Sequence, residues 1–155
     1  MDYQLRMARG LDALPQARAV REAVFVQEQG FHNEFDEVDR AAEHAALFDG
    51  ARAVAVGRAY PDPAEPACWH IGRICVLPEY RGQHLGERIM RALEERAAAL
   101  GARRVQLSAQ VQAGGFYQKL GYSAQGEPYL DEHCPHIRME KTLGVPLKVH
   151  KKMGE

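Results

Sequence analysis

The pattern of hydrophobic and polar positions in the first half of the chain predicts a strand, a helix and then three strands. Polar and apolar residues alternate over residues 3–7, which is typical of a half-buried strand. Apolar residues recur at helical spacing over residues 14–26, so a helix is expected there that ends near Gly30. The three further strands are predicted at 44–49 and 52–60, joined by a hairpin turn at Asp49-Gly50, and at 69–76.

The second half of the chain has a longer helical pattern. Ile89, Leu93, Ala97 and Leu100 are spaced by four, four and three residues and predict one face of a helix that starts at Gly86. A glycine follows directly, as expected at a helix C-terminus. The remaining predicted elements are strands at 105–109, 122–125 and 136–142 and a short helix at 115–120. The order β-α-β-β-β-α-β-α-β-β indicates one mixed α+β domain.

The composition is ordinary for a soluble globular protein. With 155 residues the chain is expected to form one domain, and 46% of its residues are hydrophobic and 26% charged. The formal net charge of -1 gives no overall field that would attract nucleic acid or an anionic membrane. No apolar run approaches the roughly 20 residues that span a bilayer, and residues 1–6 lack the apolar stretch of a signal peptide. We therefore expect a cytoplasmic protein with neither nucleic acid nor a membrane as a partner.

The cysteines give no sign of a disulfide framework or a metal site. Cys68, Cys75 and Cys134 are an odd number, and their spacing fits neither paired disulfides nor zinc ligands. Free thiols in a reducing cytoplasm are the simplest explanation, and no bound metal is expected.

The segment from Val76 to Gly86, with the sequence VLPEYRGQHLG, predicts an anion site. A strand ends at a proline, a short basic turn with a glycine follows, and then a helix starts. Such a turn directs free backbone N–H groups and the helix dipole at one point, where a phosphate would bind. The segment has neither the G-x-G-x-x-G pattern of dinucleotide-binding proteins nor the Gly-Lys-Ser/Thr of a Walker loop. The alternative is a plain connection between a strand and a helix, capped by glycine.

A second motif further along the chain has the pattern Q-x-x-A-x-x-F-Y-x-K-L-G-Y. It comprises Gln110, Ala113, Phe116, Tyr117, Lys119, Leu120, Gly121 and Tyr122. Together with the VLPEYRGQHLG segment, this motif resembles the GNAT superfamily of acyl-CoA-dependent N-acyltransferases, over about residues 20–143. The segments VFVxEQ at 24–29 and PHIxM at 135–139 look like the ElaA/YjcF-like subgroup.

The resemblance implies a fold. A GNAT-like domain is expected over residues 1–143, followed by a C-terminal tail at 144–155. Its expected architecture is α+β, with a mixed, mostly antiparallel, twisted sheet of about six to seven strands flanked by about four helices. The resemblance leaves open whether the chain forms a homodimer.

The resemblance also implies that acetyl-CoA is a co-substrate. Strand residues 74–76 are expected to splay from their neighbour at a bulge, so that main-chain groups hold the pantetheine arm and the thioester carbonyl. The residues expected to bind the cofactor are Ile74, Cys75, Val76, Arg81, Gly82, Gln83, His84, Leu85, Gly86, Gln110 and Phe116. Cys75 is expected to be a buried, inert thiol without a covalent role.

His84 departs from the family pattern, because it replaces the first glycine of the pyrophosphate motif. Glycine at this position lets the backbone approach the pyrophosphate closely. Histidine is among the few residues tolerated in left-handed conformations. Its ring could donate a hydrogen bond to a phosphate oxygen, or it could point to solvent.

Tyr117 is the predicted catalytic acid. It stands at the family's tyrosine position, and a phenol can protonate the departing thiolate; the alternative is a core aromatic on a short helix. Candidates for a base are Glu28, Asp39, His44 and His136, of which Glu28 and His136 are placed in the catalytic set. No base is needed if the amine arrives neutral.

The acceptor side of the site is less well defined by the sequence. Residues 34–39 contain four carboxylates, which could draw a cationic amine or simply form a solvated acidic loop. Phe31, Phe35 and Tyr129 could line an acceptor pocket, or each could anchor a loop.

The function predicted from these residues is transfer of an acetyl group from acetyl-CoA to a primary amine of a small molecule or peptide. The amine would attack directly in a ternary complex. The alternative is a non-catalytic acyl-CoA-binding or sensing module on the same fold. Nucleic-acid binding has only the basic segment from Lys148 to Lys152 in its favour.

Overall fold

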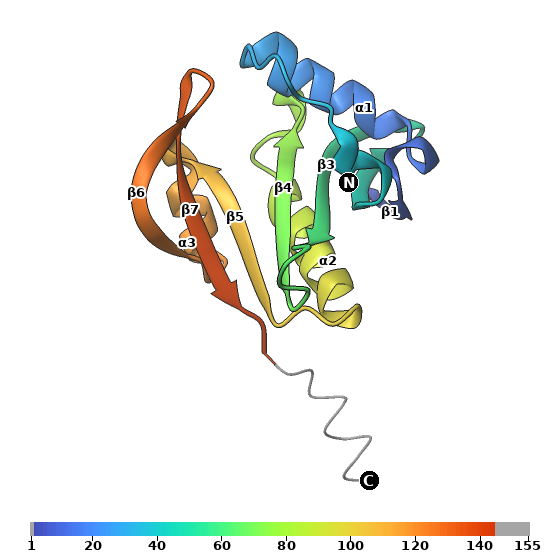
Figure 1. Ribbon diagram of the computed structural model, residues 1–155. Helices are drawn as coiled ribbons and strands as arrows, with labels where there is room; N and C mark the ends of the chain where they lie inside the picture. The colour runs from blue at the N-terminus through green and yellow to red at the C-terminus, as the bar shows by residue number, and fades with distance from the viewer. Residues whose placement is uncertain (1, 145–155) are drawn as a thin grey trace, which may run out of the picture.

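Seven strands form one sheet in the order β1-β2-β3-β4-β5-β7-β6 in the computed structural model, which describes residues 2–144 (Figure 1). The strands are β1 (Gln4–Arg9), β2 (Glu43–Asp49), β3 (Arg52–Pro61), β4 (Cys68–Val76), β5 (Arg104–Gln110), β6 (Ser123–Asp131) and β7 (Cys134–Thr142). Every neighbouring pair is antiparallel except β4 and β5, which are parallel. The predicted mixed, mostly antiparallel sheet is confirmed. Most of the predicted tail, residues 145–155, lies outside the described residues.

The described residues form three α-helices rather than about four: α1 (Gln16–Arg21), α2 (Leu85–Ala99) and α3 (Gly114–Lys119). The helix predicted at 14–26 is in fact α1 followed by a π-helical segment, η2 (Glu22–Glu28). The Gln29 N–H donates to the Val24 carbonyl, five residues back, at 3.0 Å, instead of the usual four. The π-helical segment is only seven residues long, so the hydrophobic pattern does not distinguish it from an α-helix.

Helix α2 packs its apolar face on β3 and β4. Ile89 and Leu93 are fully buried, as the predicted spacing requires. Gly57 on β3 allows this close contact, because a Cβ there would lie 2.4 Å from Ile74 Cδ1 and 2.7 Å from Ile89 Cγ2. A side chain at Gly57 would therefore displace the side chains of Ile74, Ile89 and Leu93. None of the helices in residues 2–144 is both long and apolar enough to cross a membrane.

The sheet splits between β4 and β5. Their pairing covers only Cys68–His70 against Arg104–Gln106, and in Figure 1 the two strands diverge from that end. Beyond His70, β4 pairs with β3 but with no strand on its other side within residues 2–144. A bulge in the β3–β4 pair, where Arg73 has a φ of 55°, accompanies the divergence. The splayed, bulged strand expected at residues 74–76 is thus confirmed.

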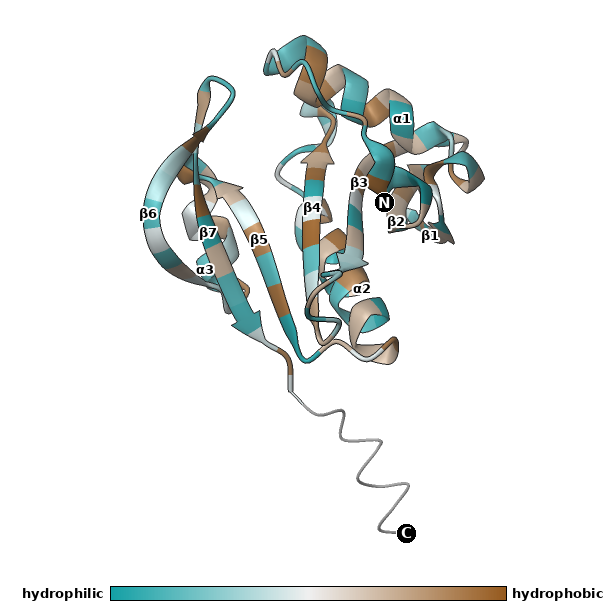
Figure 2. Cartoon of the chain, in the orientation of Figure 1, coloured by the Kyte–Doolittle hydropathy of each residue, from teal (hydrophilic) through white to brown (hydrophobic). Residues whose placement is uncertain are grey.

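Strands β6 and β7 form the far side of the split. Strand β6 extends well beyond the predicted 122–125, because an irregular register between Gln125 and Tyr129 accommodates the glycine and proline that interrupt its pattern. It is exposed along almost its whole length, and Figure 2 shows it as mostly hydrophilic or neutral, in contrast to β4. The β6–β7 hairpin therefore borders the split and does not form a second hydrophobic core.

Candidate active site

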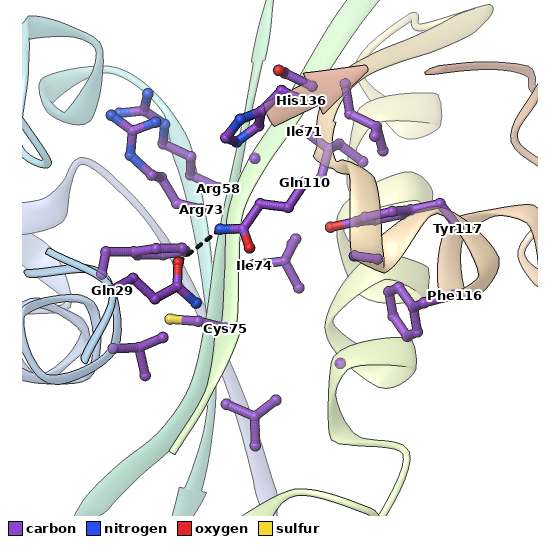
Figure 3. Close-up of a pocket in the computed structure, with 18 of the residues that line it drawn as sticks. Gln29, Arg58, Ile71, Arg73, Ile74, Cys75, Gln110, Phe116, Tyr117 and His136 are labelled. Carbon is purple, nitrogen blue, oxygen red and sulfur yellow. Dashed lines mark hydrogen bonds between the residues drawn. The ribbon is translucent and has the colours of Figure 1, made fainter. Parts of the chain in front are cut away.

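A cavity of about 790 Å³ occupies the split between β4 and β5. Segment η2, strands β4, β5 and β7, and the first turns of α2 and α3 contribute its wall. Figure 3 shows Gln29 and Cys75 on one side of this space and Phe116 and Tyr117 on the other. The cavity therefore brings together the two motifs that the sequence singled out.

The end of β4 forms one wall of the cavity. Ile74, Cys75 and Val76 all line it, along the strand edge that β5 does not cover. Cys75 is 7% exposed, and burial raises the pKa of its thiol well above the usual range, so it stays protonated. This part of the strand therefore offers backbone groups, and not a thiolate, to a ligand.

The turn from Arg81 to Gly86 has the left-handed backbone that a close approach to an anion requires. Gly82 has a φ of 84° and His84 a φ of 61°, so His84 adopts a left-handed conformation, which histidine tolerates. Helix α2 begins at the next residue, Leu85, which leaves the first backbone N–H groups of α2 without helical partners. The His84 side chain is 85% exposed and lies 3.9 Å from Glu87, and the Leu85 side chain is buried. Both residues can therefore contribute to anion binding through their backbone N–H groups.

Arg81 is held by two partners. Its Nη2 and Nη1 donate to the two carboxylate oxygens of Glu28 at 2.7 and 3.0 Å, and its Nε donates to the Val76 carbonyl at 3.0 Å. The hydrogen bond from Arg81 lowers the pKa of Glu28, which makes this carboxylate a weak proton acceptor. Gln83 accepts a hydrogen bond from the Tyr3 hydroxyl at 2.8 Å, so its side chain faces away from a ligand at the turn.

Phe116 and Tyr117 close the cavity on the side of α3. A Cβ on Gly86 would lie 3.3 Å from the Phe116 ring, so the glycine lets α2 and α3 approach each other. Tyr117 lines the cavity, and its hydroxyl makes no hydrogen bond within residues 2–144. Burial raises the pKa of Tyr117, so the phenol keeps its proton across the neutral range.

Gln110 spans the split with its side chain. Its Nε2 donates to Gln29 Oε1 at 2.7 Å, drawn as the dashed line in Figure 3, and its Oε1 accepts from Gln112 at 2.8 Å. Gln29 ends segment η2, and the π-helical turn brings its amide over the cavity. The sequence pointed to Gln110 but not to Gln29, because only the fold brings the two together.

His136 faces the cavity from β7. Its Nδ1 lies 2.9 Å from the Cys134 carbonyl oxygen, so Nδ1–H donates there and Nε2 keeps its lone pair. The ring is 6% exposed and lies between Phe31 and Tyr129, at centroid distances of 6.2 and 6.3 Å. Of the aromatic residues proposed for an acceptor pocket, Phe31 lines the cavity and Tyr129 supports His136.

The other two candidate bases lie away from the cavity. His44 is 1% exposed, and its Nε2 lies 3.0 Å from the Asp39 carbonyl oxygen. Burial lowers its pKa, so it stays neutral in the core. The Asp39 carboxylate accepts hydrogen bonds from Arg21 at 2.7 Å and from Arg58 at 2.9 Å. Neither His44 nor Asp39 can take a proton from a ligand in the cavity.

Most of the charge in the acidic loop at 34–39 is paired with arginines. Three of its carboxylates pair with arginines from other elements: Glu34 and Asp39 with Arg21, Asp36 and Asp39 with Arg58, and Glu34 and Asp36 with Arg73. Phe35 packs under the guanidinium of Arg21 at 4.8 Å instead of lining the pocket. Neither of the two alternatives describes these three carboxylates, because they belong to an ion-pair cluster that fixes the loop to the sheet.

Sequence reasoning also missed His70. It lines the cavity from β4 and pairs with Asp62, at a distance of 2.8 Å, eight residues earlier in the chain. No local spacing rule links these two positions, since a loop rich in prolines separates them. Within residues 2–144 no three His, Cys, Asp or Glu side chains are arranged to hold a metal, and all three cysteines are free thiols.

Comparison with known proteins agrees with this geometry. Residues 13–143 match the family described as acetyltransferase (GNAT) domain. The uncharacterized N-acetyltransferase YjcF of Bacillus subtilis is 39% identical over 138 residues, which cover 87% of this chain and 96% of YjcF.

Solved structures have the same fold. The crystal structure of Escherichia coli ElaA aligns with a TM-score of 0.81 at 25% identity, covering 90% of this chain and 99% of ElaA. An acyl-CoA N-acyltransferase from Pseudomonas aeruginosa aligns with a TM-score of 0.81 at 26% identity, covering 91% and 100% of the two chains. The resemblance inferred from the two motifs is confirmed, and the chain belongs to the GNAT acetyltransferase family.

Proposed function

We propose that this protein transfers an acetyl group from acetyl-CoA to a primary amine of a small molecule or peptide, in the cytoplasm. The observation that carries the proposal is the left-handed turn at Gly82 and His84, which leads into α2 directly beside the uncovered edge of β4. An anion site and a strand edge in this order suit a diphosphate followed by a pantetheine arm. The names of YjcF and of the Pseudomonas aeruginosa structure support the same chemistry.

The residues of the cavity fit acetyl-CoA as a co-substrate. The backbone N–H groups from Gly82 to Gly86, together with Arg81, would hold the diphosphate. The backbone of Ile74, Cys75 and Val76 would pair with the amides of the pantetheine arm, as a neighbouring strand would. Gln110 offers one more amide to that arm, and Phe116 packs against it.

The chemistry needs an oxyanion site, an acid and, for a cationic amine, a base. Uncovered N–H groups at the β4 bulge would stabilise the developing oxyanion. Tyr117 would protonate the departing thiolate, since its buried phenol keeps its proton. Of the two predicted bases, His136 has an Nε2 with a free lone pair, whereas Glu28 is unsuited because Arg81 occupies both of its oxygens.

The proposal is tested by measuring CoA release with a panel of primary amines for the wild type and for Tyr117→Phe. Loss of the phenol proton is expected to lower kcat by about 100-fold, while acetyl-CoA binding measured by calorimetry stays close to wild type. Tyr122→Phe is the matched control, because it removes a neighbouring hydroxyl that binds Glu94 outside the cavity. A wild type that binds acetyl-CoA but acetylates no amine would favour the non-catalytic acyl-CoA-binding module instead.

A further inference from the structure

His70 and Asp62 form a hydrogen-bonded pair at the wall of the cavity. His70 Nε2 lies 2.8 Å from Asp62 Oδ2, and the two side chains are 25% and 28% exposed. The His70 ring also stacks on Tyr60, with a centroid distance of 5.2 Å, and both rings line the cavity. A carboxylate on one side and an aromatic ring on the other fix the orientation of the imidazole.

The pair stands at the point where the sheet splits. His70 is the last β4 residue that pairs with β5, opposite Gln106. It shares a face of the sheet with Tyr60 and with Arg58, whose guanidinium lies 5.4 Å from the Tyr60 ring. The missing Cβ of Gly57, the residue next to Arg58, points at Ile89 and Leu93 of α2. Because side chains alternate along a strand, His70 lies on the face opposite α2.

Tyr117 approaches the split from the α2 side. It is carried by α3, and its neighbour Phe116 packs against Gly86 at the start of α2. His70 and Tyr117 thus line one cavity from opposite faces of the sheet. An amine that enters from the face of His70 and a thiolate that leaves towards Tyr117 would lie on opposite sides of the thioester carbon.

Asp62 sets the tautomer of His70. Hydrogen bonds from His70 and from the backbone N–H of Ala64 lower the pKa of Asp62, so it is an ionised acceptor at neutral pH. Nε2 of His70 therefore carries the proton, and Nδ1 keeps a lone pair that makes no hydrogen bond to the described residues. A positive charge on the protonated ring would lie beside the Asp62 carboxylate.

We propose that His70, oriented by Asp62, is the general base that takes the proton from the acceptor amine. This inference rests on the proposed acetyl transfer. The amine nitrogen bonds to the thioester carbon, the carbon–sulfur bond breaks, the nitrogen's proton moves to His70 Nδ1, and the Tyr117 proton moves to sulfur. Solvent then returns the proton from His70 to Tyr117, so the enzyme is restored and no other reactant is consumed.

The surroundings of the two histidines favour His70 over His136 as the general base. His136 Nδ1 donates to the Cys134 carbonyl, and the ring is 6% exposed between two aromatic rings. Arg58 lies on the same face of the sheet, with its guanidinium 5.4 Å from the Tyr60 ring, and it pairs with Asp36 and Asp39. The His70 ring thus has a carboxylate as its hydrogen-bond partner, whereas His136 has a backbone carbonyl.

The test compares His70→Gln, Asp62→Asn and His136→Gln for amine acetylation between pH 6 and 9, using the most active amine of the panel. His70→Gln is expected to lower kcat by about 100-fold and to remove the acid limb of the pH profile, with the KM for acetyl-CoA within about twofold. Asp62→Asn is expected to lower kcat by about tenfold and to change the same limb, which a purely structural role would not do. His136→Gln is expected to lower kcat by less than about tenfold and to keep the limb.

Further measurements distinguish loss of catalysis from loss of folding in these variants. Thermal unfolding and acetyl-CoA calorimetry show whether each variant folds. His32→Gln is the matched control, because the His32 side chain is 85% exposed and does not line the cavity. Added imidazole should restore part of the rate of His70→Ala but not that of His136→Ala. A His70→Gln variant that is as active as wild type overturns this inference alone. A wild type that acetylates no amine overturns the acetyl transfer and this inference together.

Discussion

The guanidinium of Arg81, in the turn before α2, donates to both carboxylate oxygens of Glu28, at the end of η2. The two distances are 2.7 and 3.0 Å. Both residues were assigned to the site from sequence, one as an anion ligand and the other as a base. Their pairing changes both roles. If Arg81 binds the diphosphate as proposed, the diphosphate and the Glu28 carboxylate compete for the same two donors.

The first prediction follows from this competition. Glu28→Gln should tighten acetyl-CoA binding by about three- to tenfold, because it removes one negative charge next to the diphosphate site and releases Arg81. Calorimetric titration with CoA measures the change. Glu79→Gln is the control, because it removes a carboxylate that lies two residues before Arg81 and pairs with Arg52 instead. A loss of kcat near 100-fold in Glu28→Gln, with folding intact, would instead restore Glu28 as a base.

The second prediction concerns the pH dependence of the acid. Burial raises the pKa of Tyr117 above that of free tyrosine, so the phenol should remain protonated up to at least about pH 10. The profile of kcat against pH should therefore show no fall from loss of this proton between pH 7 and 10. Such a fall within that range, absent in Tyr117→Phe, would contradict the buried phenol.

The third prediction separates the backbone of His84 from its ring. His84→Gly suits the left-handed φ of 61° and removes only an exposed side chain, so CoA affinity should stay within about threefold of wild type or increase. His84→Val should weaken CoA binding by tenfold or so, because a β-branched residue does not adopt this conformation without strain. Binding that collapses in His84→Gly but not in His84→Asn would show that the imidazole itself holds the phosphate.

The elements that local patterns describe could be predicted well. The hairpin at Asp49-Gly50 and the buried face of α2 depend on neighbours two to four residues apart, and the structure has both. The left-handed backbone at His84 could be expected from its place in a motif. The π-helical form of η2 could not, because its hydrophobic pattern fits an α-helix equally well.

Side-chain pairs that only the fold brings together could not be predicted from the sequence. Arg21 meets Glu34 and Asp39 only because α1 lies against the loop at 34–39, and nothing in the spacing marks these carboxylates as neutralised. The same holds for Gln29 with Gln110, which are 81 residues apart. The sequence therefore indicated the cavity-lining segments in which motifs are continuous, and it did not indicate the pairs that depend on long-range contacts.

The last prediction tests the ion-pair cluster that fixes the acceptor-side loop. Burial raises the pKa of Asp39, but hydrogen bonds and charge from Arg21 and Arg58 outweigh it and bring the pKa from 3.8 to about 2. A depressed pKa stabilises the folded state above the unfolded value and loses that effect as pH falls. The contribution of Asp39 should therefore be complete above about pH 4 and disappear towards pH 2, worth about 2 kcal/mol in the free energy of unfolding.

Asp39→Asn should remove this contribution and leave Arg21 and Arg58 with one fewer counter-charge in the interior. We expect the free energy of unfolding, measured with urea at pH 7, to fall by about 3 kcal/mol, and its dependence on pH between 4 and 2 to become flatter. Glu37→Gln is the matched control, because that carboxylate is 83% exposed and lies 3.8 Å from Arg40. An Asp39→Asn protein as stable as wild type at pH 7 would mean that the loop is held by packing and backbone hydrogen bonds. In that case its position at the cavity would not depend on the cluster.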